Sequence, residues 1–542
     1  MDKKFPILAL LLIAVGAVVG GLVGRLPAKT SAEGKVTIES VSTEYSEALS
    51  LIDKNYGGTI DHEKVTDTSM QAMLWTLDPH SSFFDREQLK RMDEEQASQF
   101  YGIGVSILQH HNGVYVQSVV PGTPADKGGI RYGDRILTVE GKDATEWTSA
   151  EVSKNVRGPR GTQVKVTVER ATSAQPLEFE LVRGGVPLPS VRNSFMLPNS
   201  VGYIGFTGGF QQTSADEVAS SIAELKKQGM KNLILDMRGN PGGILEQAVE
   251  IVSDFVPAGQ TVVSVKSSRS DKVRDLKTVG GTVENFPMVM LINGGSASAS
   301  EIVAGALQDY SRGLVVGTDS FGKGLVQRVF RLPYGTGLTL TTARYYTPYG
   351  RSLQRDYSSG SIYEYYSHGD ADPKDAAPKP VGQPVTLPTG RVLYGGRGIE
   401  PDVVAEPAEP NPLRGRINEA AFLFARQIVA GKVAGFESLR AEKQSFKQVL
   451  APGEFAVSDK LFELFKAFAA NEKAVGLTTE NVVATAEYAK MRLRLEIATA
   501  HYSSEAGIQV LLEADPQVAK AMESMPEAAK LMQNNGIFKA SR

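Results

Sequence analysis

Met288-Val-Met-Leu-Ile-Asn293 is followed directly by Gly294-Gly-Ser-Ala-Ser298-Ala-Ser-Glu301, and this junction decides the fold class of the chain. The first run is short, apolar and uninterrupted, as in a strand that is buried on both faces. The second opens a helix that continues through Ile302 and Leu307. A strand, a glycine-rich turn and a helix in succession belong to a βα unit. Such strand-to-helix junctions are where α/β proteins place their chemistry.

Further βα units surround this junction. The stretch Ser214-Ala-Asp-Glu217 is a capping box that opens a helix, and Asn240-Pro-Gly-Gly243 connects a strand to the next helix. We therefore expect an α/β core with crossover connections over residues 187–405. The other predicted elements are strands 201–206, 232–236 and 314–317 and helices 214–230 and 245–255.

Composition excludes several classes of protein. The chain has 542 residues, 42% of them hydrophobic, which is enough for several domains with separate cores. A formal charge of −3, with basic residues dispersed among acids, argues against a nucleic-acid binder. The absence of cysteine excludes thiol catalysis, disulfides and thiolate metal sites. No His-Glu-x-x-His motif occurs either, so we predict neither a metal nor another cofactor.

The first 30 residues predict a membrane anchor or signal segment. Lys3 and Lys4 precede an uncharged run over 5–24, about 20 residues and therefore long enough to cross a bilayer as a helix. A cleaved signal peptide remains the alternative, with Thr30-Ser-Ala32 as its cleavage site. An uncleaved anchor predicts a single-pass protein of the bacterial inner membrane, with its catalytic part facing the periplasm or the cell exterior.

Residues 35–95 are predicted to be helical. Val41, Tyr45, Leu49 and Ile52 recur at helical spacing. His80 follows the Asp78-Pro79 stop and is interpreted as a structural turn residue rather than a catalytic base.

Residues 96–186 alternate in short strands and include a hairpin at Asn112-Gly113. This segment resembles a PDZ domain through Gly102-Ile103-Gly104-Val105 and through the stretch 120–137. In that resemblance Gly102, Ile103, Gly104 and Val105 present backbone N–H groups to a terminal carboxylate, and the next strand edge pairs with an extended peptide. The alternative is that these glycines only form a tight turn.

Ser298 and Lys323 form a candidate catalytic pair. A serine at the first turn of a helix has its own and the next N–H free, and the helix dipole favours an oxyanion there. The simpler interpretation is a helix cap. Lys323 lies in Ser320-Phe-Gly-Lys323-Gly-Leu-Val-Gln327, between glycines and among apolar residues, where burial would lower its pKa enough for it to act as a base.

Two further residues bear on this pair. Gln327 would share a strand face with Lys323, although a direct contact needs leaning side chains or a bent backbone. Ser320 and Lys323 also match the Ser-x-x-Lys signature of penicillin-binding acyltransferases, which requires both residues on one helical face. Glycines around the lysine and the strand pattern after it disfavour that alternative.

The chain resembles the carboxyl-terminal processing, or tail-specific, serine peptidases of family S41 over roughly residues 35–405. Five motifs carry the resemblance in the family's order, namely 295–302, 317–324 with Gln327, 236–243, 341–348 and 398–402. It implies a crotonase/ClpP-like α/β core with an inserted PDZ domain. It also implies Ser298 as nucleophile, Lys323 as general base and Gln327 as the residue that orients the lysine. Ala299 and one of Gly242 and Gly243 would form the oxyanion hole.

The resemblance implies an endopeptidase that recognises protein C-termini through its PDZ domain and processes or degrades envelope proteins. A non-catalytic PDZ scaffold on a protease fold is the alternative. Arg157 and Arg160 are candidates for a contact between domains, with a solvated basic turn as the other interpretation.

Two segments extend beyond a minimal family member. Residues 354–396 are predicted to form an insertion loop, and residues 410–542 a helical region that includes a helix capped by Ser458. We interpret the helical region as a packing or oligomerisation appendage. Docking of an adaptor and a cover that limits substrate access remain alternatives.

Overall fold

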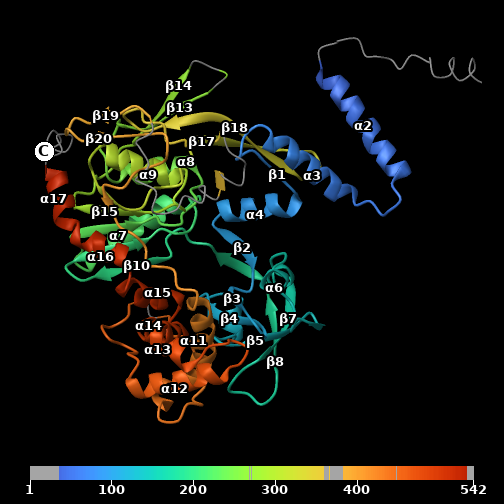
Figure 1. Cartoon of the computed structure of the whole chain (residues 1–542), viewed down its shortest axis with the longest axis vertical. Coiled ribbons are helices and arrows are strands. Elements are labelled where there is room, and N and C mark those ends of the chain that lie inside the picture. Colours follow the sequence, from blue (N-terminus) through green and yellow to red (C-terminus); the bar gives the residue numbers. More distant parts are fainter. Residues whose placement is uncertain are drawn as a thin grey trace, which may run out of the picture. The chain divides into compact units, whose positions relative to one another are not determined.

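The computed structural model describes residues 36–267, 269, 272–358, 365–366, 382–446 and 449–533 (Figure 1). Within these ranges, no helix combines the length and the apolar character that crossing a membrane requires. The predicted anchor over 5–24 lies outside the described residues.

The first described helix, α2 (Ile38–Asn55), begins at a capping box formed by Thr37 and Ser40, and none of its residues is buried. Helix α3 (His62–Trp75) follows, with Leu74 buried. Strand β1 (Ser82–Phe84) and helix α4 (Arg86–Gln96) complete this part of the chain. The prediction of a helical segment thus holds apart from the short strand.

A six-stranded sheet forms the α/β core, in the order β10-β11-β12-β15-β16-β21. All neighbouring strands are parallel except β10, which pairs antiparallel with β11 at one edge. Every residue of β15 is buried, as expected of a strand covered on both faces. The strands are β10 (Asn193–Leu197), β11 (Val201–Gly205), β12 (Asn232–Asp236), β15 (Met288–Ile292), β16 (Leu314–Gly317) and β21 (Val403–Val404).

Helices cover both faces of this sheet, and alternate residues of β15 pack against the helices on opposite faces. Met288, Met290 and Ile292 share a core with the first set of helices, whereas Val289 and Leu291 share one with the last helices of the chain. The first set is α7 (Ser214–Lys227), α8 (Leu245–Ser253) and α9 (Ala299–Asp309); the second is α15 (Ser504–Glu513), α16 (Pro516–Glu523) and α17 (Met525–Gln533). The α/β fold class is confirmed.

A second sheet borders the core. Strand β18 pairs with β17 along its length, and β1 and β13 also pair with β18. Its members are β1, β13 (Thr261–Lys266), β14 (Val273–Lys277), β17 (Leu325–Arg331) and β18 (Gly337–Tyr346). A hairpin of β19 (Val385–Thr386) and β20 (Val392–Leu393) lies in the predicted insertion.

The small β domain is inserted into the chain through a two-stranded ribbon, in which β2 (Gln99–Gly102) pairs with β9 (Gly184–Pro187). Its own sheet has the order β3-β4-β5-β7-β8. A hairpin joins β3 to β4, with its turn at His111-Asn112, one residue before the predicted Asn112-Gly113, because His110 pairs with Gly113. The elements are β3 (Val105–His110), β4 (Gly113–Val119), α5 (Pro124–Gly128), β5 (Arg135–Val139), β6 (Lys142–Asp143), α6 (Ser149–Val156), β7 (Gln163–Glu169) and β8 (Leu177–Val182).

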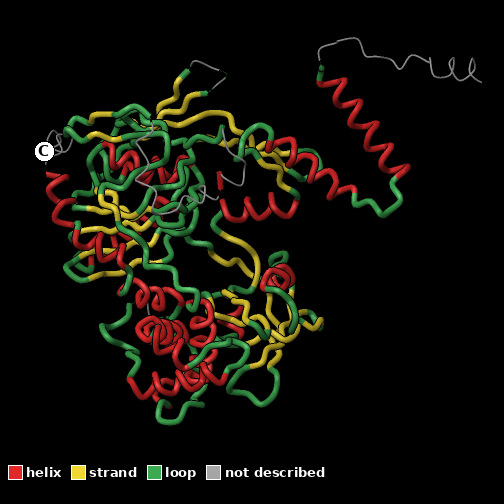
Figure 2. Tube along the Cα trace, in the orientation of Figure 1, coloured by secondary structure: helices red, strands yellow, loops and turns green. Residues whose placement is uncertain are grey.

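The remaining C-terminal helices pack on this small domain (Figures 1 and 2). Tyr115 and Tyr132 of the small domain are buried in the apolar core that these helices form. Tyr132 also donates its hydroxyl hydrogen to Glu496 at 2.9 Å. These elements are α11 (Arg414–Val429), the 3-10 turn η1 (Glu437–Leu439), α12 (Asp459–Asn471), α13 (Thr479–Ala484) and α14 (Ala486–His501). The helical region thus divides between two cores, one with the small domain and one with the central sheet.

Candidate active site

Ser298 lies at the turn between β15 and α9, as the N-cap residue of the helix. Its backbone has φ 56° and ψ −113°, an unusual conformation for a residue with a side chain. Ser296 stabilises the turn, since its hydroxyl accepts from Asn293 N at 3.0 Å and donates to Met237 O at 2.8 Å. Ser298 itself is half-buried. Its position at a strained junction with access to solvent suits a nucleophile.

The loop 237–243 after β12 is hydrogen-bonded to this turn. The Asn240 carbonyl accepts from Ala297 N at 3.0 Å and from Ser300 Oγ at 2.9 Å. Gly242 lies against Ser298, because an added Cβ would come within 2.7 Å of the Ser298 Cβ. Only glycine fits there, so the sequence of the loop follows from its close approach to the turn.

The backbone N–H groups near Ser298 differ in their partners. Gly242 donates to Asn240 Oδ1 at 2.9 Å. The residues on either side of Gly243 bond Phe210: the Gly242 carbonyl accepts from Phe210 N at 2.9 Å, and Ile244 N donates to Phe210 O at 2.8 Å. The N–H of Gly243 itself therefore points away from Phe210. Among the hydrogen bonds of the described residues, none uses the N–H of Gly243 or Ala299. Both remain available for an oxyanion, which favours Gly243 over Gly242.

Glu301 joins the two candidate catalytic segments. One carboxylate oxygen, Oε2, accepts from Ser298 N at 2.8 Å and from Lys323 N at 2.9 Å. The other accepts from Gly322 N at 2.7 Å and from the Ser320 hydroxyl at 2.5 Å. The expectation that Ser298 keeps its own N–H free is therefore wrong, because this buried carboxylate binds it.

Lys323 is half-buried and lies two residues before β17. Burial lowers its pKa, against the opposing influence of the Glu301 and Asp78 carboxylates. Within the described part of the chain, no hydrogen bond joins Lys323 Nζ to Ser298 Oγ or to Gln327. Gln327 instead donates from its amide nitrogen to Thr341 Oγ1 at 3.1 Å, which leaves its amide oxygen as an acceptor.

The alternative pairing of Ser320 with Lys323 lacks the helix that it needs, because residues 319–324 form no helix. Ser320 is buried, and its hydroxyl is occupied by Glu301 and by Ile399 N, which donates to it at 2.7 Å. This serine supports the loop and has no access to a substrate.

The turn Asp78–Ser81 lies near the candidate base and includes His80, which the sequence predicts to be a structural turn residue. Asp78 accepts from the backbone of His80 and Ser81, both at 2.8 Å. Burial, together with the charge of Lys323, lowers the pKa of His80 to about 4, so this imidazole is neutral at neutral pH. Its Nε2 lies 2.7 Å from the Tyr365 hydroxyl. His80 thus lies in the surroundings of the candidate base.

Tyr345 is another residue that sequence reasoning missed. Burial and the Glu301 carboxylate raise its pKa well above the usual value, which keeps the hydroxyl protonated beside Ser298. Both Tyr345 and Glu301 lie inside the quoted motifs, so the signal was present, but residue type alone does not indicate which side chains turn inward.

The predicted peptide-binding loop lies at the start of β3. Gly104 has φ +84°, and a Cβ there would come within 2.3 Å of Thr123, so glycine is required. No hydrogen bond of the described residues uses the N–H of Ile103 or Gly104. Gly102 ends β2 and Val105 begins β3, a strand at the edge of its sheet. The loop and the open strand edge thus lie together, as peptide addition to a sheet requires.

Arg157 follows helix α6 and lies near this loop. Its guanidinium stacks on the Phe100 ring at 4.0 Å and lies 3.9 Å from the Glu94 carboxylate on α4. The contact with α4 agrees with the predicted role of Arg157 between domains. Among the residues that the structure describes, none forms an ion pair with Arg160. Among the described residues, no group of three or more side chains is arranged to hold a metal ion.

Comparison with known proteins extends these observations. The family model for peptidase family S41 matches residues 200–360, and that for the PDZ domain matches residues 91–169. The chain is 37% identical to the carboxy-terminal-processing protease of Bartonella bacilliformis over 298 residues, which cover 54% of this chain and 68% of the relative.

Two further proteins are similar to this chain. The carboxy-terminal processing protease CtpA of Bacillus subtilis is 33% identical over 320 residues, covering 59% of this chain and 68% of that protein. The solved structure of a photosystem II D1 C-terminal processing protease has 29% sequence identity and a TM-score of 0.32, covering 57% of this chain and 83% of that one. On the family match and the identity to its bacterial relatives, the chain belongs to the carboxy-terminal processing proteases of peptidase family S41, hydrolases of peptide bonds, and carries a PDZ domain.

Proposed function

We propose that the protein is a serine endopeptidase whose nucleophile is Ser298 and whose general base is Lys323. The observation that carries this assignment is the Glu301 carboxylate, whose Oε2 accepts from the backbone of both residues at 2.8 and 2.9 Å. One buried group thereby holds the two segments beside each other. The lowered pKa of Lys323 supports its role, because a base must be uncharged to take a proton.

The chemistry proceeds in two steps. Neutral Lys323 takes the Ser298 hydroxyl proton as Oγ attacks the scissile carbonyl carbon, and the N–H groups of Ala299 and Gly243 stabilise the oxyanion. The tetrahedral intermediate collapses to an acyl-enzyme when the lysine returns the proton to the leaving amine. Water then attacks the ester carbon and gives a proton to Lys323. Lys323 passes this proton to Ser298 Oγ as the acyl bond to the serine breaks, which releases the new carboxyl terminus and restores the serine hydroxyl.

Gln327 is proposed to orient the lysine. Its amide oxygen is the acceptor left over from the bond to Thr341, and a turn of the Lys323 side chain toward it would direct the amine. Because no hydrogen bond joins Lys323 to Ser298 in the described residues, substrate binding would complete the dyad.

The PDZ domain is proposed to select the substrate by its C-terminus. The N–H groups of Ile103 and Gly104 would bind the terminal carboxylate, and the preceding residues would pair with strand β3. Substrates are then unfolded proteins with free C-termini. On the pattern of residues 1–30 we propose that they are envelope proteins and that the enzyme is held at the bacterial inner membrane. An adaptor or a second copy would bind the C-terminal helices.

The test uses the full chain in mild detergent and an unfolded protein that ends in apolar residues. We expect cleavage by the wild type and a loss of at least about 1,000-fold in kcat for Ser298→Ala and for Lys323→Ala. A substrate with an amidated C-terminus should be cut more slowly through a higher KM. Equal cleavage by the wild type and both variants would refute the assignment of the dyad.

A further inference from the structure

Arg238 connects the loop after β12 to the C-terminal helices. Its Nε and Nη2 bind the Asp236 carboxylate at 2.6–3.1 Å. Its other nitrogen, Nη1, donates to Asp515 Oδ2 and Gln517 Oε1, both at 2.8 Å. Burial disfavours the charged guanidinium, but Asp236 and Asp515 outweigh this effect and raise the pKa of Arg238. The side chain is therefore charged and is held from two sides.

The same loop carries part of the candidate oxyanion hole. Residues 237–243 are hydrogen-bonded to the nucleophile turn through the Asn240 carbonyl, and Gly242 lies in contact range of Ser298. A displacement of Arg238 would therefore shift the Gly243 N–H relative to the nucleophile. Oxyanion donors lose most of their effect when they are misplaced by about 1 Å.

Asp515 uses its two oxygens for different purposes. Oδ1 caps helix α16 by accepting from Gln517 N at 2.8 Å and from Val518 N at 3.1 Å. Oδ2 binds Arg238 and has no part in the cap. The Gln517 side chain also has two partners: its amide nitrogen donates to Ala405 O at 2.7 Å, and its amide oxygen accepts from Arg238. The helix could be capped without either contact to Arg238.

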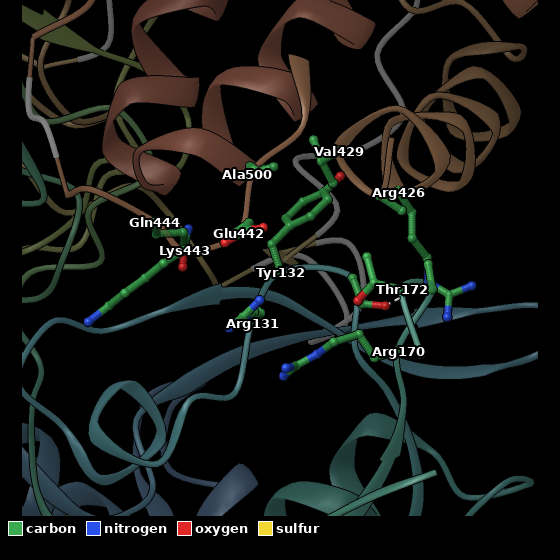
Figure 3. A pocket seen from close by; sticks show the side chains of 14 residues that line it. Arg131, Tyr132, Arg170, Thr172, Arg426, Val429, Glu442, Lys443, Gln444 and Ala500 are labelled. Carbon is green, nitrogen blue, oxygen red and sulfur yellow. Dashed lines mark hydrogen bonds between the residues drawn. The ribbon is translucent and has the colours of Figure 1, made fainter. Parts of the chain in front are cut away.

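Helix α16 is a firm support for such contacts. Val518 and Ala521 are buried against the central sheet, so the helix cannot move without exposing apolar surface. Other C-terminal helices hold the PDZ domain, and Figure 3 shows Tyr132 among residues that include Val429 and Ala500. One helical region thus contacts both the substrate-selecting domain and the catalytic loop.

We propose that Asp515 and Gln517 are positioning residues for the oxyanion hole, acting through Arg238. The C-terminal helical region is then a working part of the active site rather than an appendage. The inference rests on the proposed roles of Ser298, Ala299 and Gly243.

The experiment measures kcat and KM of the full chain with the apolar-tailed substrate. Asp515→Ser keeps a good N-cap but is too short to reach Arg238, and Gln517→Ala removes the second acceptor. We expect the double variant to lose about tenfold in kcat with KM within about twofold. Glu513→Gln is the control, since Glu513 pairs with Arg494 in the same region.

A second comparison separates positioning from stability. Combined with Arg238→Ala, the double change should cause no further fall in kcat, because its effect already passes through Arg238. Thermal unfolding of each variant reports losses of fold. A double variant that matches the Glu513→Gln control in kcat, or a loss confined to KM, would overturn the inference while leaving the dyad intact. If the Ser298→Ala variant cleaved the substrate as fast as the wild type, both the inference and the proposed dyad would be overturned.

Discussion

Replacement of Glu301 by glutamine gives the sharpest test of the site, because it changes a charge and a hydrogen-bond pattern with little change in volume. The carboxylate accepts four hydrogen bonds, from Ser298 N, Lys323 N, Gly322 N and the Ser320 hydroxyl. Glutamine keeps one acceptor oxygen. If that oxygen remains with Ser298 and Lys323, the new NH2 group faces the Gly322 N–H and leaves it unpaired.

The magnitudes follow from these bonds. An unpaired buried N–H costs about 1–3 kcal/mol, and two charge-assisted bonds that become neutral lose roughly 1 kcal/mol each. Glutamine is neutral, so the variant no longer has to bury a charge, and this gain offsets part of the loss. The cost of burying the carboxylate is evident because burial raises the pKa of Glu301. We expect the free energy of unfolding to fall by roughly 2–4 kcal/mol. Because the spacing of the two catalytic segments loosens, kcat should fall by about 100-fold.

The direction in which the pH dependence of kcat shifts tests whether Glu301 acts on Lys323. The negative charge of Glu301 stabilises charged Lys323 and so raises its pKa. Removing that charge lowers the pKa, so the neutral base becomes available at lower pH. We therefore expect the rising limb of kcat against pH to move toward acid in Glu301→Gln, while the maximum falls.

The assay is kcat measured across pH, with urea unfolding of the same variants. Glu496→Gln is the matched control, because Glu496 is also fully buried and hydrogen-bonded but lies in the C-terminal helices beside Tyr132. It should lose stability without moving the limb. A limb that stays in place, or moves toward alkaline pH, in Glu301→Gln would refute the coupling of Glu301 to Lys323.

Three further outcomes are expected. Burial lowers the pKa of both His80 and His110 to about 4, so between pH 6.5 and 4 the unfolded chain binds protons that the folded chain does not. Stability should fall as pH falls through this range, by on the order of 3 kcal/mol per histidine, and His110→Phe should flatten the urea-unfolding profile. Gly242→Ala should lower kcat by about 100-fold or more, because its Cβ would come within 2.6–2.8 Å of the nucleophile turn; activity at the wild-type level would contradict the close packing. Gly104→Ala, with φ +84° and a contact at 2.3 Å, should weaken binding of a C-terminal peptide by at least about tenfold in calorimetry, and unchanged affinity would place the carboxylate elsewhere.

Several local predictions are confirmed by the structure. Strand β12 has the predicted bounds, and Ser458 caps helix α12 by accepting from Leu461 N. A hairpin also forms near Asn112-Gly113, but one residue earlier than predicted, since His110 pairs with Gly113 and the turn residues are His111 and Asn112. These features depend on neighbours in the chain, so residue order contains the information that they need.

A distant partner overturns the prediction for the start of helix α7. Ser214 was predicted to cap helix α7, but it is buried, bonds Ser190 at 2.5 Å and accepts from Gln211 N, while Thr213 is the N-cap residue. A serine that satisfies the local pattern is drawn away by a partner 24 positions earlier. Periodicity cannot show such a competitor.

The sequence by itself determined the α/β class, the inserted PDZ domain and the identity of the candidate nucleophile and base, because buried strand runs and glycine turns are local and the family motifs keep their order. Only the tertiary structure decided how these parts act together. In the folded chain Glu301 bonds the backbone of both Ser298 and Lys323. The Gly242 N–H donates to Asn240, whereas, within the described residues, the Gly243 N–H stays available. Asp515 binds Arg238 from a distant part of the chain. The physical reason is that burial and hydrogen-bond geometry depend on segments far apart in the chain, whose meeting no spacing or composition records.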